Sequence, residues 1–388
     1  MRADVLVIGG GSAGLAAAVS AARQGARTVL VERHGMLGGM GTASLVHTFC
    51  GLYLIDGDSP EFANDGLPRE IAGRMEAATG RGPVKMGRVW VLPQHPVDFA
   101  TIADELIREA GVERLFHSEL ISLEPGWRAR VVCRGESFEI ESASVIDASG
   151  DAVAAALLDV PDERTPSERL QRPAYVCGVQ GVSGEVSGLE LAGRIVEGIR
   201  AGFLPKSAMG MHFRASGRPG EIFGTLDLTG EETGSYDPTD PACLSALEST
   251  GREHARQVVS YFKDHQPGWE NAYVAHWPAR AGVRESRRWV GEACLTGDEI
   301  LSGARHDDDV ALASWPLELR ETNRGPKLRY PDGGEAAGIP AGALRARGFE
   351  RLFVAGRCLS CDHDAQASIR VMGTCFATGE AAGRMATT

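Results

Sequence analysis

The feature that most constrains this chain is a glycine-rich turn that joins a short apolar strand to a helix near its start. Residues 5–8 (VLVI) form a continuous apolar run, which is typical of a parallel strand buried on both faces. Gly9, Gly11 and Gly14 follow in the spacing GxGxxG. In a nucleotide-binding turn the first glycine makes the tight turn, the second admits a pyrophosphate, and the third lets the helix pack on the sheet.

An acidic residue completes this unit. A helix is predicted after the glycines with Gly25 as its stop, and residues 26–31 read as a second strand that ends at Glu32. An acid roughly 20 residues beyond the glycines can accept hydrogen bonds from a ribose hydroxyl. The sequence therefore predicts nucleotide binding; the alternative, a glycine-rich turn that binds nothing, does not explain why an acid ends an apolar strand.

Length, composition and charge limit the classes of protein that this chain fits. A chain of 388 residues forms one large domain or two intimate ones, and 43% hydrophobic with 24% charged residues is an ordinary globular composition. The net charge of −12 argues against nucleic acid or an anionic membrane surface as the main partner. No apolar run approaches the roughly 20 residues that span a bilayer, and three residues before the first strand leave no room for a signal peptide. We expect a cytoplasmic protein whose eight scattered cysteines are reduced thiols.

Glycines also mark the next segment, residues 33–41 (RHGMLGGMG). Three glycines in four positions keep side chains away from something that passes close to the backbone, although a flexible surface loop is the alternative. Helices are predicted at residues 68–78 and 96–110. Strands at 112–123, 129–133 and 137–140 suggest a small antiparallel layer laid over the main sheet. Residues 143–151 (ASVIDASGD) are predicted to return to the main sheet as a strand that ends in an acid, where ligands bind in open α/β sheets.

The rest of the chain divides into an irregular middle and a distinctive end. From about 155 to 335 there is no nucleotide fingerprint; helices are predicted at 189–201 and 244–265 and a strand at 221–227. We assign this region to a second domain that shapes the substrate site. A strand is predicted at 352–355 and a helix at 371–385. The glycines and alanines of this last helix indicate close packing or a close backbone approach to a ligand, and a helix packed on the sheet without a ligand is the alternative.

Five separated motifs together carry a family resemblance. They are VIGGGSAG at 7–14, Glu32 followed by GMLGGMGT, IDASGD at 146–151, GVRESRRWVGEACLT at 282–296, and FVAGRCLSCDHDAQASIRVMGTCFATGEAAG at 353–383. They resemble the FAD-dependent oxidoreductases of the glutathione-reductase-like fold, in particular two-domain flavoproteins distantly similar to the succinate dehydrogenase and fumarate reductase flavoprotein subunits. The resemblance covers both ends well and the middle thinly. It implies an α/β fold in which a Rossmann-like FAD-binding domain (1–155 and 336–388) carries a second α+β substrate domain (156–335).

The resemblance also implies which residues hold FAD, position by position. The pyrophosphate would lie at the helix N-terminus on Gly9, Gly11, Ser12, Ala13 and Gly14. The adenosine would meet Glu32 and Arg33 at its ribose and the backbone of Leu120 at its adenine. The ribityl chain and flavin would run along Gly38, Gly39 and Met40, and the diphosphate side would be closed by Gly150 and Asp151. Gly356 and Arg357 would return the last strand to the cofactor, and Gly373 and Thr374 would offer backbone N–H groups to flavin N1 and O2.

Several absences refine this interpretation. There is no second GxGxxG, which argues against a separate NAD(P)H domain, and Cys50 stands alone where disulfide reductases keep a cysteine pair. Cys358 and Cys361 form a CxxC that is either a dithiol or, as we favour, two small buried residues. No cysteine run fits an iron–sulfur cluster, and no metal site is predicted. The residues around His47 do not match the covalent attachment motif of the succinate dehydrogenase group, so FAD is expected to be non-covalent.

Catalysis on a flavin needs a cation to hold the substrate and a proton donor or acceptor near N5. His363 is the first choice for the proton role, since the resemblance puts its segment beside the flavin; the alternative is a residue that only caps the final helix. If residues 283–290 form a strand, Arg284 and Arg288 share one face and can bind a carboxylate, unless they belong to a salt-bridged surface strand. Arg370 is a third candidate cation. His47 and His276 are weaker options for the proton role.

The sequence therefore predicts an FAD-dependent oxidoreductase of the dehydrogenase, reductase or oxidase type, which moves a hydride between a small organic substrate and flavin N5. The second electron partner is left open among oxygen, a quinone and a partner protein, and so is the oligomeric state. One alternative is a flavin monooxygenase or hydroxylase on the same fold. Another is a flavoprotein that binds or modifies a macromolecule such as RNA, against which the acidic charge counts. A protein that keeps FAD only as structure is the last alternative.

Overall fold

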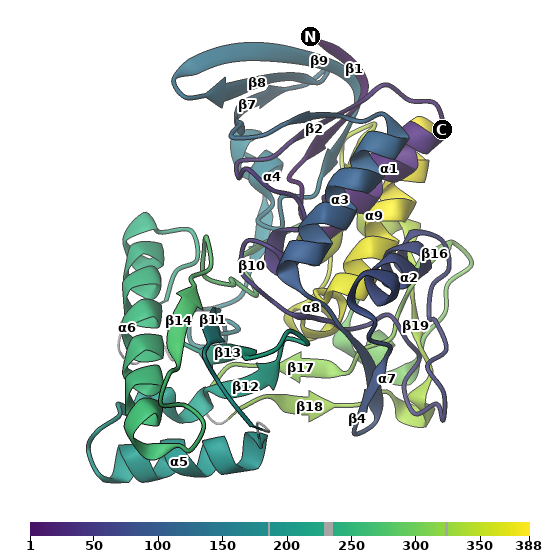
Figure 1. Ribbon diagram of the computed structural model, residues 1–388. Helices are drawn as coiled ribbons and strands as arrows, with labels where there is room; N and C mark the ends of the chain where they lie inside the picture. The colour runs from purple at the N-terminus through teal and green to yellow at the C-terminus, as the bar shows by residue number, and fades with distance from the viewer. Residues whose placement is uncertain (185–186, 229–235, 323–324) are drawn as a thin grey trace.

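A seven-stranded sheet forms the centre of the largest of the apolar cores in the described residues (Figure 1). The computed structural model describes residues 1–184, 187–228, 236–322 and 325–388. The sheet has the strand order β6 (Glu113–Leu115), β2 (Thr28–Val31), β1 (Arg2–Ile8), β9 (Glu136–Asp147), β8 (Arg128–Cys133) and β7 (Glu119–Glu124), with β20 (Leu352–Val354) paired to β9. β6, β2, β1, β9 and β20 run parallel, so their carboxyl ends meet at one edge. The predicted α/β fold with a Rossmann-like βαβ start is confirmed.

One long strand, β9, belongs to both the parallel and the antiparallel part of this sheet. Its first half pairs antiparallel with β8, and its second half lies parallel to β1 and β20. The prediction of a separate antiparallel layer over the main sheet is therefore wrong. The strand alternates buried and exposed residues where one face meets solvent and is buried continuously where both faces are covered. That change of pattern made one strand look like two. The predicted strand at 112–123 is divided instead, because a turn at His117, with φ of 53°, separates β6 from β7.

Helices α1 (Ser12–Arg23), α3 (Pro96–Ala110), α9 (Met372–Thr387) and α2 (Leu67–Thr79) lie together beside this sheet (Figure 1). The glycines of α9 explain how closely it approaches α1. A Cβ atom on Gly379 would lie 2.1 Å from the carbonyl oxygen of Ala13, and one on Gly383 would lie 2.4 Å from that of Ala17. The small residues of the last helix therefore serve helix packing, the first of the two reasons that the sequence suggested.

A second, antiparallel sheet lies below the first in Figure 1 and has its own apolar core. Its strand order is β12 (His212–Ala215), β13 (Glu221–Asp227), β11 (Ala174–Gln180) and β14 (Tyr273–His276), and it packs against α5 (Gly188–Arg200) and α6 (Pro241–His265). The helices predicted at 189–201 and 244–265 and the strand at 221–227 are confirmed. This core draws its residues from 170–281, whereas Trp289, Leu295 and Leu344 pack in the first core. The domain limits at 155 and 335 stay a prediction.

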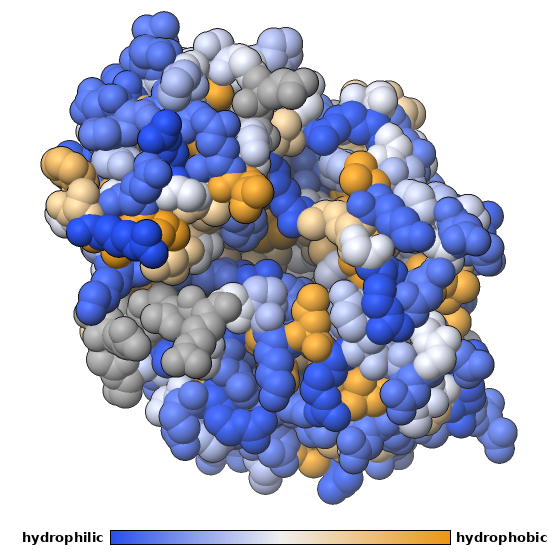
Figure 2. Space-filling model, turned by 90° about the horizontal axis from the view of Figure 1, so that it is seen from below, coloured by the Kyte–Doolittle hydropathy of each residue, from blue (hydrophilic) through white to orange (hydrophobic). Residues whose placement is uncertain are grey.

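The remaining helices and strands are short. They are β3 (Thr48–Phe49), β4 (Val84–Met86), β5 (Val89–Pro93), α4 (Val153–Leu157), β10 (Asp162–Arg164), β15 (Arg287–Trp289), α7 (Gly297–Ser302), β16 (Asp309–Ala313), β17 (Leu317–Leu319), β18 (Lys327–Arg329), β19 (Ala337–Pro340) and α8 (His363–Ile369). Seen from below, the molecule is hollowed near the centre of this face (Figure 2). In the described part of the chain, no helix combines the length and apolar character needed to cross a membrane.

Candidate functional site

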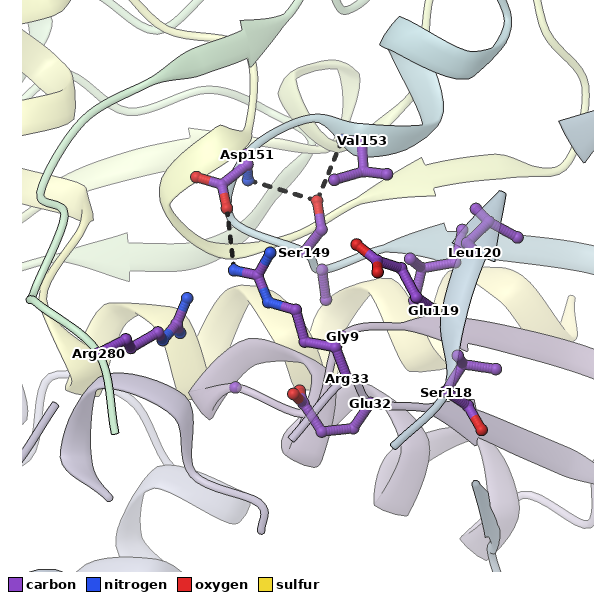
Figure 3. A pocket seen from close by; sticks show the side chains of 14 residues that line it. Gly9, Glu32, Arg33, Ser118, Glu119, Leu120, Ser149, Asp151, Val153 and Arg280 are labelled. Atoms are coloured by element: carbon purple, nitrogen blue, oxygen red, sulfur yellow. Dashed lines mark hydrogen bonds and ion pairs between the residues drawn. The ribbon is translucent and has the colours of Figure 1, made fainter. Parts of the chain in front are cut away.

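A narrow pocket of about 70 Å³ lies where the parallel strands end (Figure 3). It collects residues from the glycine-rich turn, the end of β2, the start of β7 and the end of β9. Its lining includes Gly9, Gly11, Glu32, Arg33, Ser118, Leu120, Ser149, Asp151 and Arg280. One pocket thus contains six residues that are widely separated in sequence and to which the resemblance gives a role in FAD binding.

The glycine-rich turn is crowded on one side and open on the other. A Cβ atom on Gly14 would lie 1.8 Å from the carbonyl oxygen of Gly9, and Gly9 itself has a φ of +93°. At Gly11 a Cβ atom would have no heavy atom of the described residues within 4 Å. Gly11 is the N-cap of α1, which Ser12 and Ala13 begin. The open side of Gly11 at a helix N-terminus fits a phosphate group.

Glu32 is held rigidly at the wall of this pocket. The side chain is 7% exposed, and its two oxygens accept hydrogen bonds from the backbone N–H groups of Gly10 (2.7 Å) and His34 (2.8 Å). Each carboxylate oxygen has a further lone pair, so both can still accept a hydrogen bond from a ribose hydroxyl. Leu120 lines the same pocket from β7.

Asp151 and Arg357 close the pocket together. Arg357 donates to Asp151, to the carbonyl oxygen of Gly150 (2.7 Å) and to that of Val283 (2.5 Å). Ser286 also donates to Asp151, at 2.7 Å. Burial opposes ionisation of Asp151, but Arg357 and Ser286 outweigh it and lower its pKa to about 2. These hydrogen bonds connect the segment that follows β9 to the segment that follows β20, where Gly356 precedes Arg357.

The segment with glycines 38, 39 and 41 packs directly on the glycine-rich turn. Gly38 and Gly39 are buried, and the N–H of Gly38 donates to the carbonyl oxygen of Gly10 (2.8 Å). A Cβ atom on Gly39 would lie 2.8 Å from the Cα atom of Gly11. These contacts exclude the flexible surface loop that the sequence allowed. Met40, which follows, lines a second cavity.

The start of α9 differs from what the resemblance implies. The N–H of Gly373 donates to the carbonyl oxygen of Cys50 (2.9 Å), so that N–H is engaged within the protein. Thr374 keeps a buried hydroxyl oxygen that has no hydrogen-bond partner among the described residues. This orphaned oxygen, the open side of Gly11 and the unpartnered Nε atom of Arg280 fit a cofactor with a diphosphate and polar ring atoms.

The second cavity has a volume of about 340 Å³, and Met40 and Met372 belong to its lining. Ligand pockets of enzymes have volumes of roughly 300–1,000 Å³. Its polar lining comprises His47, Thr48, Cys50, His212, Arg214, Thr225, Arg284, Glu318, Arg320, Tyr330 and Arg370. Because Met40 and Gly373 flank the position that the resemblance gives to the flavin, the cavity lies next to that position.

Arginines outnumber carboxylates around this cavity. Arg284 and Arg320 both bind Asp227, Arg284 at 2.6 Å, and Arg320 also binds Glu318 at 2.6 Å. Arg370 donates only to the carbonyl oxygen of Glu318 (3.0 Å), and its Nε atom has no partner in the described structure. Burial lowers the pKa of Arg370 to about 10. Four arginines therefore face two carboxylates, which favours an anionic ligand.

Arg214 is the other cation here that lacks an acidic partner. Its guanidinium contacts the sulfur of Met86 at 3.4 Å, and no carboxylate of the described residues lies within ion-pair distance. Two histidines share this environment. Burial, reinforced by Arg214, lowers the pKa of His47 to about 3 and that of His212 to about 4, so both rings are neutral. The cavity thus combines cations with neutral proton acceptors.

His47 is oriented by two contacts. Its Nδ1 atom lies 3.2 Å from the carbonyl oxygen of Leu45, and its ring stacks on Phe223 with 4.9 Å between centroids. Since a carbonyl oxygen can only accept, Nδ1 carries the proton and Nε2 is left as an acceptor.

His363 and Arg288, two of the four predicted catalytic residues, do not line the cavity. His363 is held between Glu285 and Glu321, at 2.9 Å from each, and these partners outweigh burial and raise its pKa. Arg288 binds Glu285 at 2.6 Å and the carbonyl oxygen of Cys361 at 2.9 Å. Both residues belong to a buried ionic cluster. Arg284 and Arg370, the other two, do line the cavity.

The expectation that residues 283–290 form a strand explains why Arg288 was predicted to lie on the same face as Arg284. Only Arg287–Trp289 is a strand, and the chain before it is irregular. The alternation rule, which would put Arg284 and Arg288 on one face, therefore does not apply. Arg284 reaches the cavity, whereas Arg288 reaches the ionic cluster.

Sequence reasoning missed Arg280, His212, Arg214, Glu318 and Arg320. The sequence contained a pattern that could have identified the last four of these residues. His212 and Arg214 are two residues apart in β12, and Glu318 and Arg320 are two apart along β17 and the residue after it. Polar residues at a spacing of two on one strand share a face. Arg280 lies in a segment without such a pattern.

The described residues contain no cluster of three or more histidine, cysteine or acidic side chains that could hold a metal ion. Cys358 and Cys361 are free, buried thiols, and burial raises the pKa of both. A raised pKa keeps a thiol protonated and unreactive, which fits the interpretation as small buried residues.

One family of sequences and several solved structures are similar to this chain. A sequence model of the family described as FAD dependent oxidoreductase matches residues 4–388. The comparison with curated protein sequences returned no match. Among solved structures, a triple mutant of the flavin-dependent brominase Bmp2 is 12% identical over 99% of this chain and 80% of its own, with a TM-score of 0.48. A geranylgeranyl bacteriochlorophyll reductase-like protein from Thermoplasma acidophilum is 14% identical over 100% of this chain and 77% of its own, with a TM-score of 0.46.

The OxyS anhydrotetracycline hydroxylase from Streptomyces rimosus is 15% identical over 98% of this chain, with a TM-score of 0.46, and the chain spans 60% of the length of that protein. Two further similar structures are also matched over 60% of their own length.

Proposed function

The chain belongs to the FAD dependent oxidoreductase family and its cofactor is FAD; from this premise we propose that it moves a hydride between flavin N5 and a small organic anion, such as a carboxylate, bound in the 340 Å³ cavity. The observation that carries the proposal is the excess of arginine over carboxylate in a cavity that Met40 and Met372 help to line. Arg214 and Arg370 have no acidic partner among the described residues, so a substrate anion would be their counter-ion.

The roles that we propose for the pocket residues follow from the contacts above. Gly9, Gly11 and the start of α1 hold the diphosphate of FAD, Glu32 holds the ribose, and Thr374 meets the polar edge of the flavin. When bound, FAD supplies the acceptor or donor for the hydride at N5.

Arg370 and Arg284 bind and orient the anionic group of the substrate. Arg284 is fixed for this by Asp227 and by the carbonyl oxygen of Arg172 (2.5 Å). Arg370 is the stronger anchor because no carboxylate of the described residues pairs with it and competes with the substrate.

His47 replaces His363 as the proposed proton acceptor. It lines the cavity, it is neutral, and its Nε2 atom accepts a proton while Nδ1–H stays bound to Leu45. His363 lies between two glutamates outside the cavity lining. We therefore propose that His363 and Arg288 support the site without contact to the substrate.

The test begins with the visible spectrum of the purified protein and continues with anaerobic reduction. Flavin absorbance released into the supernatant by acid would identify a non-covalent cofactor. A panel of small carboxylates, matched with their amides, is then mixed with the oxidised protein without oxygen. We expect bleaching by a carboxylate but not by its amide, lost in Arg370→Met and kept in Arg130→Met, a change of an exposed arginine.

Bleaching by amides and carboxylates alike would contradict the anionic substrate. Rapid bleaching by NAD(P)H, followed by a substrate-dependent oxygen reaction, would contradict direct hydride transfer and favour a monooxygenase. To test His47, we would compare His47→Gln with His363→Gln. The rate of bleaching should fall by about 100-fold or more only in the first.

A further inference from the structure

We propose that Arg280, which is carried by the second sheet, is the counter-ion of the cofactor diphosphate and that cofactor binding thereby fastens the second sheet to the first. The inference rests on FAD as the cofactor but not on the proposed substrate or on hydride transfer. It concerns a residue outside every motif that carried the family resemblance.

The backbone around Arg280 bridges the two cores. Arg280 follows β14, and two residues later Gly282 exchanges hydrogen bonds with Ala174 of β11 (2.7 and 3.0 Å). On the other side, the N–H groups of Ala279 and Arg280 donate to the carbonyl oxygen of Ala43, at 2.8 and 3.3 Å. Ala43 lies two residues after Gly41, the last glycine of the segment that packs on the glycine-rich turn. The arginine is therefore held by the second sheet and aimed at the first.

The side chain of Arg280 enters the pocket at the glycine-rich turn without an ion-pair partner among the described residues. Arg280 lines the pocket, and its buried Nε atom has no hydrogen-bond partner among the described residues. No carboxylate of the described residues lies within ion-pair distance of it, whereas Arg33 and Arg357 both pair with Asp151. Burial, then repulsion by Arg33 and Arg357, lowers the pKa of Arg280 to about 10. Arg33 and Arg357 thus share Asp151, whereas Arg280 forms an ion pair with neither Asp151 nor Glu32, the two carboxylates that act on it.

The position along the pocket indicates which part of a dinucleotide Arg280 meets. In Figure 3 Arg280 lies at one end, Leu120 and Ser118 lie toward the other, and Asp151 lies between them. An adenine at the Leu120 end and a ribose at Glu32 put the diphosphate beside Gly11, on the side toward Arg280. A diphosphate carries two negative charges, and a guanidinium can bind phosphate oxygens in bidentate fashion.

One consequence distinguishes this arrangement from a pocket built by the first sheet alone. A ligand that bears a diphosphate would bind residues of both cores, and one without it would bind only the first. Binding of the diphosphate should therefore reduce the opening of the contact between Ala43 and residues 279–280.

The experiment uses the full chain after removal of FAD and measures the affinity for ADP and for adenosine by calorimetry. ADP carries the diphosphate, and adenosine does not. We expect Arg280→Met to lower the affinity for ADP by about 10-fold or more, which corresponds to the loss of one charge-assisted hydrogen bond or ion pair. The affinity for adenosine should stay within about twofold of that of the unaltered protein. Arg280→Lys should restore part of the ADP affinity, and Arg130→Met should change neither affinity.

Hydrogen exchange gives a second readout that does not depend on affinity. ADP at saturation should slow exchange at the amides of Ala279, Arg280 and Gly282 in the unaltered protein, and adenosine should not. This protection should disappear in Arg280→Met even when ADP is raised to saturate it. Equal weakening of ADP and adenosine, or unchanged ADP affinity, would overturn the proposal.

The outcomes also separate this inference from the proposed function. If ADP binds and depends on Arg280 but no carboxylate bleaches the flavin, only the proposed substrate fails. If neither ADP nor adenosine binds the unaltered protein, the nucleotide pocket is misassigned and the role of Arg280 falls with it.

Discussion

Two arginines of the same cavity should respond in opposite ways to the same substitution. Arg370 and Arg320 both line the cavity, and methionine replaces either side chain with an apolar one of similar length. Arg320 binds two carboxylates, whereas Arg370 binds none among the described residues. We therefore compare Arg370→Met with Arg320→Met, and measure the free energy of unfolding of the protein without FAD.

The structure sets the magnitude for Arg370. Burial lowers the pKa of Arg370 from 12.5 to about 10. That difference corresponds to about 3 kcal/mol of unfavourable environment for the charged form. Removing the side chain relieves this cost and loses the hydrogen bond to the carbonyl oxygen of Glu318, which contributes about 1.5 kcal/mol. Arg370→Met should leave the free energy of unfolding unchanged or raise it by about 1–2 kcal/mol.

Arg320→Met has the opposite consequence. The side chains of Glu318 and Asp227 are 13% and 11% exposed, and Arg320 lies between them. Removing one partner of a buried ion pair leaves an uncompensated charge and costs about 3–5 kcal/mol. Arg284 still binds Asp227, so most of this cost falls on Glu318.

The assay is equilibrium unfolding in urea at pH 7, followed by tryptophan fluorescence and by circular dichroism. The two variants should differ by at least about 3 kcal/mol, with Arg370→Met the more stable. If Arg370→Met loses as much stability as Arg320→Met, Arg370 has a structural partner and is not reserved for a ligand. A stable Arg370→Met that no longer responds to substrate would be a trade of stability for function.

Three further outcomes are expected. Gly11→Ala should fold normally, because its Cβ atom enters open space, but that space is the one proposed for FAD, so FAD should bind at least about 10-fold more weakly. Gly379→Ala should instead lower the melting temperature, because its Cβ atom would lie 2.1 Å from a carbonyl oxygen. Glu285 raises the pKa of His363, so the stability that His363 contributes is present below about pH 6.5 and is lost as the pH rises through the raised pKa. In His363→Gln the urea midpoint should therefore depend less on pH between pH 6 and 9. An unchanged pH dependence would contradict this. In the native protein a thiol reagent should label exposed Cys294 before buried Cys358, and early labelling of Cys358, read by mass spectrometry, would revive a redox role.

The pocket at the glycine-rich turn could be predicted because its geometry is local. Gly9, Gly11, Gly14 and Glu32 fall within one βαβ unit, where the strand, the turn and the helix fix every relative position. The sequence spacing of such a unit is also its spatial spacing. The pocket accordingly contains Glu32 and Asp151, the acids predicted at two strand ends.

The cavity could not be predicted in the same way, because it is assembled from segments that approach only after folding. His47, Arg214, Arg284 and Arg370 come from four parts of the chain, and the direction of each side chain depends on what packs beside it. His363 shows the point: its segment lies near the cavity, but Glu285 and Glu321 hold its ring elsewhere.

The sequence by itself determined that this chain builds a nucleotide-binding α/β unit, because periodicity and glycine spacing act within a few residues of each other. Only the tertiary structure decided which charged groups neutralise one another and which are left over. Within the described residues, Arg288 and Arg320 pair with carboxylates, while Arg280 and Arg370 do not. Charge compensation depends on distances of a few ångströms between residues that are far apart in the chain, and such distances exist only in the folded protein.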